Sequence, residues 1–166
     1  MSGENKLLVM RHSKSSWKTN EPDHRRPLSG RGTRDAVVAG QFLAVHAPDL
    51  VWVSSATRAV QTWQCAQLGG ASAAHAVTSD SLYAASADTM LGVLARTPES
   101  ASVVVLIAHE PGVSDLVTKL AAPSALTDEV AAHFPTSAIA VLSHDQDWSN
   151  LTPGSCTLDS VEIPRG

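Results

Sequence analysis

The chain has 166 residues and a formal net charge of −4, with a sequence pI near 5.9. This length is typical of one domain with its own core, so we expect a single domain over 1–166 that needs no disulfide or metal ion to fold. The acidic balance argues against nucleic acid as a partner and confines any cationic site to a local patch, which suits a small anionic group.

The first part of the chain alternates short apolar runs with helical patterns. Four consecutive apolar residues predict a buried strand over 7–10. A long polar stretch over 13–31 follows, and such loops in compact domains are usually functional or disordered. Helical spacing of apolar residues predicts a helix over about 33–45, and a second apolar run predicts a strand over 50–53.

The rest of the chain continues this alternation. Thr57 is a suitable N-cap for a helix that closes at Gly69, and a weak strand lies near 76–77. The further predicted elements, in order, are a helix over 88–96, the strongest strand over 102–108, a helix over about 113–120, a strand over 138–142 and a short tail with a turn at 153–154. Alternating strands and helices, with strands apolar throughout, favour a three-layer α/β/α fold around a mostly parallel sheet.

Cysteine use and the start of the chain bear on location and cofactors. We interpret Cys65 and Cys156 as reduced thiols, because no CxxC pair or Cys/His cluster has the spacing of zinc ligands. The apolar run at 7–10 is too short for a signal peptide or a membrane span. We therefore expect a cytoplasmic protein without a cofactor, a metal ion or a membrane partner.

Polar side chains follow three of the predicted strands at the point where each strand ends. Arg11 and His12 follow the first, Arg58 lies shortly after the second, and His109 follows the strongest. In open α/β sheets, ligands bind beyond the carboxyl ends of the strands. Any one of these residues is best explained as an ordinary loop residue, but all four at one edge predict a shared site.

Two arginines and two histidines in one crevice suit a phosphoryl group, since guanidinium forks match phosphate oxygens. A histidine can attack phosphorus when its other ring nitrogen is held by a partner. No Walker loop, GxGxxG or DxD-type cluster accompanies the set. The pattern predicts a site for a phosphoryl group that needs no metal ion for its positive charge, and from the residues alone either His12 or His109 could attack.

Five ordered segments resemble the histidine phosphatase superfamily, and within it the SixA-type phosphohistidine phosphatases. The first reads Arg11-His12-Ser13, with Ser13 in place of the glycine of the family signature. The segments that carry the resemblance are 8–13, 26–32, 53–62, 107–112 and 134–140. The resemblance implies one histidine phosphatase domain over 1–166, with the phosphoglycerate mutase-like fold and no large lid insertion.

The resemblance also implies roles. His12 would be the nucleophile that becomes phosphorylated, Arg11, Arg58 and His109 would hold the phosphoryl oxygens, and water would hydrolyse the intermediate. The general acid stays open between Glu110 and Asp80; Glu110 is equally well explained as part of a turn into a helix, and Asp88 as a helix cap.

The sequence also suggests further substrate contacts, partners and alternative functions. Ser13, Lys14 and Arg26 are candidates for phosphate or substrate contact, and Trp17, which we expect to be exposed, could touch a protein substrate or cover a small core of the loop itself. The expected partner is a phosphorylated protein or a small phosphorylated compound, bound by a monomer or weak oligomer. A broad-specificity small-molecule phosphomonoesterase and a non-catalytic phosphate-binding module are the alternatives, and a mutase is disfavoured by the short chain.

Overall fold

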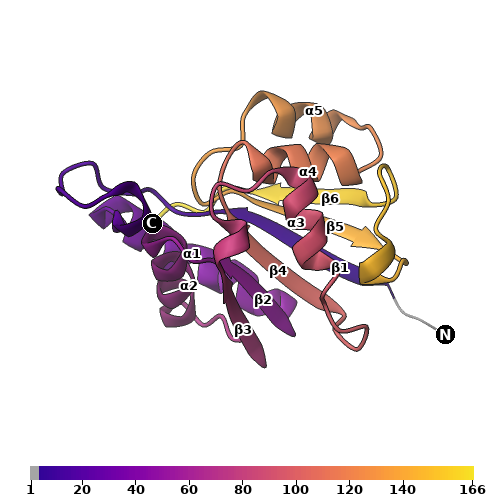
Figure 1. Cartoon of the computed structure of the whole chain (residues 1–166), viewed down its shortest axis with the longest axis horizontal. Helices are drawn as coiled ribbons and strands as arrows, with labels where there is room; N and C mark the ends of the chain where they lie inside the picture. Colours follow the sequence, from indigo (N-terminus) through magenta and orange to yellow (C-terminus); the bar gives the residue numbers. More distant parts are fainter. Residues whose placement is uncertain (1–3) are drawn as a thin grey trace.

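A six-stranded sheet forms the centre of the molecule in the computed structural model, which describes residues 4–166 (Figure 1). The strands are β1 (Asn5–Arg11), β2 (Leu50–Ser54), β3 (His75–Ser79), β4 (Val103–Ala108), β5 (Ile139–His144) and β6 (Thr157–Glu162). The helices are α1 (Gly30–His46), α2 (Thr57–Leu68), α3 (Ala87–Leu94), α4 (Gly112–Leu120) and α5 (Ala125–Ala132), with 3-10 turns η1 (Asp23–Arg25), η2 (Asp80–Leu82) and η3 (Trp148–Asn150).

The strand order is β3-β2-β4-β1-β5-β6. The first four strands pair in parallel, whereas β5 pairs antiparallel to β1 and to β6. This confirms the mostly parallel sheet and the three-layer α/β/α arrangement. The antiparallel β5 brings its start, rather than its end, to the edge at which β1, β2 and β4 finish.

Helices cover both faces of the sheet, which explains why β1 is apolar throughout. Leu8 and Met10 pack with α1 and α2 on one face, while Leu7 and Val9 pack with α3 and α4 on the other. All four side chains are fully buried. A strand buried on both faces reads as a continuous apolar run, so the predicted strand 7–10 is confirmed.

Two elements were not predicted from the sequence, α5 and β6. A capping box opens α5, since Ser124 Oγ accepts from the Thr127 amide and Thr127 Oγ1 accepts from the Ser124 amide. The tail expected after Trp148 instead forms β6, which is mostly exposed and shifts register opposite Val141 and Leu142. Its mixed polar composition hides the strand pattern.

The loop after β1 crosses the first turn of α1 closely. That helix begins at Gly30 instead of the predicted 33, because Ser29 Oγ caps the Gly32 amide. A Cβ at Gly32 would lie 2.0 Å from the carbonyl oxygen of Lys14, so only glycine allows this crossing. Within residues 4–166 no helix is both long and apolar enough to span a bilayer.

Candidate active site

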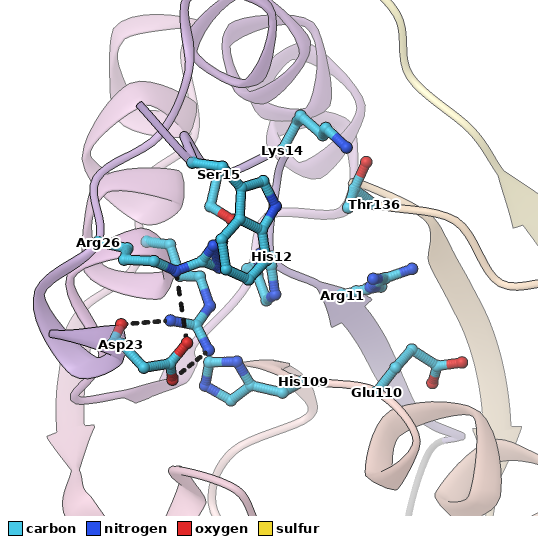
Figure 2. A pocket seen from close by; sticks show the side chains of 11 residues that line it. Arg11, His12, Lys14, Ser15, Asp23, Arg26, His109, Glu110 and Thr136 are labelled. Carbon is cyan, nitrogen blue, oxygen red and sulfur yellow. Dashed lines mark hydrogen bonds and ion pairs between the residues drawn. The ribbon is translucent and has the colours of Figure 1, made fainter. Parts of the chain in front are cut away.

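A pocket of about 290 Å³ lies at the edge of the sheet where β1 and β4 end. Its lining combines three arginines, two histidines, one lysine and two acidic residues: Arg11, His12, Lys14, Ser15, Trp17, Asp23, Arg26, Arg58, His109, Glu110 and Thr136. Figure 2 shows Arg11 and Glu110 on one side of His12 and Arg26 and Asp23 on the other. The structure thus brings together all four residues that the strand ends predicted.

His12 is 7% exposed, and hydrogen bonds to two main-chain carbonyls hold it in place. Its amide donates to Ala108 on β4 at 3.0 Å, and its Nδ1 donates to the Ser13 carbonyl at 2.7 Å. A carbonyl oxygen only accepts, so the hydrogen resides on Nδ1 and the Nε2 lone pair is free. Burial, reinforced by the nearby cationic groups, lowers the pKa of His12 to about 3, so the ring is neutral at pH 7.

His109 lies beside His12, with 5.0 Å between the ring centroids. Its Nε2 is 2.7 Å from Ser54 Oγ, which already accepts from the Ala56 amide at 3.3 Å. The Ser54 hydrogen is therefore available to Nε2, and in that arrangement Nδ1 carries a hydrogen to offer. Burial first, and then the charge of Arg58, lower the pKa of His109 to about 4.

Several buried N–H groups around the pocket have no acceptor within the described residues 4–166. They are Arg11 Nε, Arg26 Nη1, Arg58 Nε and His109 Nδ1. These donors are available to an acceptor that enters the pocket, and hydrogen bonds from cationic donors to a charged acceptor are stronger than neutral ones. The group that satisfies several such donors at once is a compact oxyanion.

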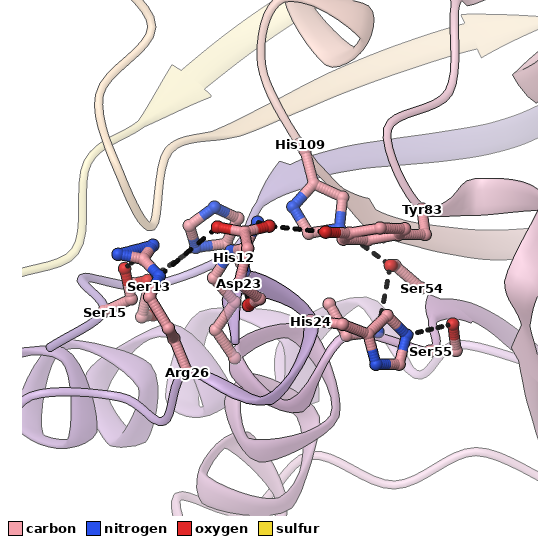
Figure 3. A network of polar contacts seen from close by, with 12 residues as sticks. His12, Ser13, Ser15, Asp23, His24, Arg26, Ser54, Ser55, Tyr83 and His109 are labelled. Atoms are coloured by element: carbon pink, nitrogen blue, oxygen red, sulfur yellow. Dashed lines mark hydrogen bonds and ion pairs between the residues drawn. The ribbon is translucent and has the colours of Figure 1, made fainter. Parts of the chain in front are cut away.

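Asp23 is a pocket residue that sequence reasoning missed. It lies on η1, where its main-chain carbonyl accepts from Arg58 Nη1 at 2.8 Å and its carboxylate pairs with Arg58 at 3.2 Å and Arg26 at 3.4 Å. Tyr83 donates to the same carboxylate at 2.5 Å (Figure 3). That hydrogen bond, followed by Arg58 and Arg26, lowers the pKa of Asp23. The polar composition of the loop indicated that the segment could be functional, but no motif or residue spacing pointed to Asp23 in particular.

The two basic candidates of the loop also reach the pocket. Arg26 is 7% exposed, and its Nη2 donates to Ser15 Oγ at 2.7 Å. Lys14 lines the pocket from the same loop. Ser13 differs, because its hydroxyl is fully buried against Ser137 Oγ at 2.5 Å and it is not among the lining residues. Its hydroxyl ties the end of β1 to the segment before β5 instead of facing the pocket.

Similarity to known proteins extends over nearly the whole chain. The sequence model of the histidine phosphatase superfamily (branch 1) matches residues 7–83. The uncharacterized protein Rv1276c of Mycobacterium tuberculosis (strain ATCC 25618 / H37Rv) is 37% identical over 162 residues, covering 94% of this chain and 100% of its own. Together with the solved structures below, the match over residues 7–83 shows that the chain belongs to the histidine phosphatase superfamily.

Solved structures show which branch of the superfamily the chain resembles. A protein assigned as phosphohistidine phosphatase SixA from Nakamurella multipartitia has a TM-score of 0.89 and 32% identity, covering 98% of each chain. Another with the same assignment, from Agrobacterium tumefaciens, has a TM-score of 0.80 and 26% identity, covering 96% of this chain and 98% of its own. The chain is thus a phosphatase of the SixA-type branch.

The acid candidates of this histidine phosphatase lie in different surroundings. Both carboxylate oxygens of Glu110 accept from Ser114, one from its amide at 2.8 Å and one from its hydroxyl at 2.9 Å. Asp80 is exposed at the start of η2 and is not among the pocket residues. Asp88 lies in the first turn of α3 and pairs with Lys119. Glu110 is the predicted acid that borders the pocket, and each of its oxygens accepts one hydrogen bond from Ser114.

Proposed function

We propose that this phosphatase hydrolyses phosphohistidine on a protein through a covalent phosphohistidine intermediate on His12. The observation that carries the proposal is a neutral buried imidazole whose Nε2 lone pair is free, in a pocket surrounded by N–H groups without acceptors. A free lone pair is what a nucleophile requires, and prepared donors stabilise charge on transferring oxygens. The likeness to proteins assigned as SixA supports the substrate class.

In the first step, the Nε2 lone pair of His12 forms a new P–N bond while the bond from phosphorus to the leaving nitrogen breaks. The Ser13 carbonyl keeps the Nδ1 hydrogen in place and stabilises the positive charge that develops on the ring. Arg11, Arg58 and His109 would hold the phosphoryl oxygens through their free donors.

The leaving group decides how much acid catalysis the step needs. The conjugate acid of imidazole has a pKa of ~6.5, so a substrate histidine leaves without a strong acid, taking its proton from solvent. An aliphatic alkoxide generally needs a proton donor. Here the pKa of Asp23 is lowered, and hydrogen bonds from Ser114 to both oxygens of Glu110 stabilise its carboxylate form. Both observations favour P–N bonds over alkyl phosphate esters.

In the second step, a water oxygen bonds to phosphorus and the P–N bond to His12 breaks. Inorganic phosphate leaves, the water releases a proton to solvent, and His12 returns to its neutral state with Nε2 free. The same free donors of the arginines and His109 would hold the oxygens through this step.

We further propose that neither step needs a metal ion. The pocket already holds three guanidinium groups, Arg11, Arg26 and Arg58, which supply the positive charge that a metal would otherwise bring. Turnover of the wild-type protein should be the same with and without EDTA. Loss of turnover in EDTA that a divalent ion restores would contradict this part of the proposal.

The intermediate can be tested by trapping. Brief exposure to a ³²P-labelled phosphohistidine protein, followed by quenching, should leave label on this chain that is acid-labile and base-stable, as a P–N bond is. His12→Ala should abolish trapping and turnover, while His75→Ala, an exposed histidine at the start of β3, should change neither. Label that maps to His109 would overturn the mechanism. A strong preference for an alkyl phosphate ester would overturn the substrate class alone.

A further inference from the structure

Charge is distributed unevenly along the chain. Residues 13–31 contain five Lys or Arg residues and two acidic residues, although the whole chain has a net charge of −4. Arg26 is buried in the pocket, while Lys14 and Lys18 are exposed on the loop. The loop that borders the pocket is therefore a basic surface on an acidic protein, which favours the approach of acidic partners.

Trp17 occupies an unusual place in this loop. It is 75% exposed, although the other three tryptophans are all buried. The guanidinium of Arg26 stacks over its ring at 3.4 Å from the centroid, and Arg26 is itself fixed by Ser15. The main chain beneath is ordered too, because the Ser16 amide donates to the Pro27 carbonyl at 2.8 Å. Trp17 is thus a supported aromatic surface presented to solvent.

A second hollow of about 330 Å³ adjoins the catalytic pocket. Lys14, Ser15 and Trp17 line both cavities, so the two share a wall. The remaining residues of the second hollow are Ser16, Lys18, Ser29 and Gly30. Its charged lining residues, within the part of the chain that the structure describes, are both lysines. We call this second cavity the Trp17 hollow.

We propose that the Trp17 hollow is a docking surface for an acidic segment of a protein substrate, next to its phosphorylated histidine. The inference rests on the proposed function and extends it to the partner's sequence. A phosphoryl group needs the catalytic pocket alone, whereas chain that continues from it on a protein substrate would reach the adjoining hollow, which shares a wall with that pocket. Lys14 and Lys18 would attract carboxylates there, and the Trp17 ring offers area for an apolar side chain.

Two matched peptides test whether the Trp17 hollow prefers acidic residues. Each carries one phosphohistidine, flanked either by Asp and Glu or by Asn and Gln at the same positions, and phosphoramidate serves as a substrate without flanks. The wild-type protein should turn over the acidic peptide with a kcat/KM about tenfold higher than the amide-flanked peptide. This gap should shrink in high salt, because exposed charges are screened.

Lys18→Glu tests the site, since Lys18 lines the Trp17 hollow and is not among the residues of the catalytic pocket. It should lower kcat/KM for the acidic peptide about tenfold and leave phosphoramidate within about twofold. Arg96→Glu makes the same charge change at an exposed residue between α3 and the start of β4 and should affect neither substrate. Equal losses on peptide and phosphoramidate in Lys18→Glu would overturn the docking surface.

Trp17 gives a readout that does not depend on turnover. Because the other tryptophans are buried, acrylamide quenching reports mainly on Trp17. In the His12→Ala protein, the acidic phosphopeptide should protect Trp17 from quenching more than its amide-flanked partner. Equal protection, or none, would count against the docking surface. Protection by the acidic peptide without turnover in the wild-type protein would instead sink the proposed function and leave the docking surface standing.

Discussion

The end of the sheet and the polar loop contribute to one pocket but are held in different ways. Main-chain bonds fix the sheet residues, since the His12 amide donates to Ala108 and the Arg11 amide to Ala138, each at 3.0 Å. The pocket residues of the loop depend more on side-chain contacts, as Asp23 does on Tyr83 and Arg58. Substitution at the sheet end should therefore remove chemistry without moving the neighbours, while substitution in the loop should displace other groups.

The largest effect expected at the sheet end, His12 apart, is that of His109→Ala. This change removes a donor to the transferring oxygens, so turnover should fall about 10²–10³-fold, the scale for one such donor. Quench-flow with labelled substrate should still trap an adduct on His12, because the nucleophile remains in place. Complete loss of trapping would mean that His109 also positions His12 and that the sheet end is less independent than its main-chain bonds indicate.

The same two histidines make stability depend on pH. In the unfolded chain each takes up a proton below about pH 6.5, whereas in the fold His109 does so only near 4 and His12 near 3. The free energy of unfolding should therefore fall as pH drops from 6.5, by roughly 2 kcal/mol per histidine at pH 5. Urea unfolding should show that the free energy of unfolding falls less between pH 7 and pH 5 for His109→Gln than for wild type. An equal fall in both proteins would contradict this pH dependence.

In the loop, Asp23→Asn should give an intermediate effect. The side chain keeps its shape but loses the charge that pairs with Arg58 and Arg26, so Arg58 becomes less well oriented. We expect kcat/KM to fall about tenfold and the inhibition constant of inorganic phosphate to rise, with Tyr83→Phe showing a smaller shift in the same direction. Tighter phosphate binding in Asp23→Asn would instead mean that the carboxylate competes with phosphate.

The smallest effect is expected at Asp80. Because Asp80 is exposed and not among the pocket residues, Asp80→Asn should keep turnover of phenyl phosphate, whose poor leaving group needs a proton donor, within about twofold of wild type. A loss of tenfold or more would bring Asp80 back as the proton donor. It would also show that η2 moves toward the pocket when substrate binds.

Sequence reasoning succeeded where one local pattern decides the structure. Apolar runs identified β1, β2, β4 and β5, and the rule that ligands bind beyond strand ends brought Arg11, Arg58 and His109 to His12. It failed where distant segments decide. Asp23 and Tyr83 lie 60 residues apart and meet only in the fold. The polar β6 is a strand because β5 offers it a partner, which no pattern within 157–162 reveals.

The close crossing at Gly32 has a consequence for protein engineering. The carbonyl of Lys14 occupies the space of a side chain at that position, and Ser29 ties to the same carbonyl through its amide at 2.9 Å and its hydroxyl at 3.1 Å. This loop, grafted onto a scaffold that carries a side chain at the position of Gly32, would clash unless the start of α1 came with it. Residues 13–32 should therefore be moved as one cassette when the loop is exchanged between relatives.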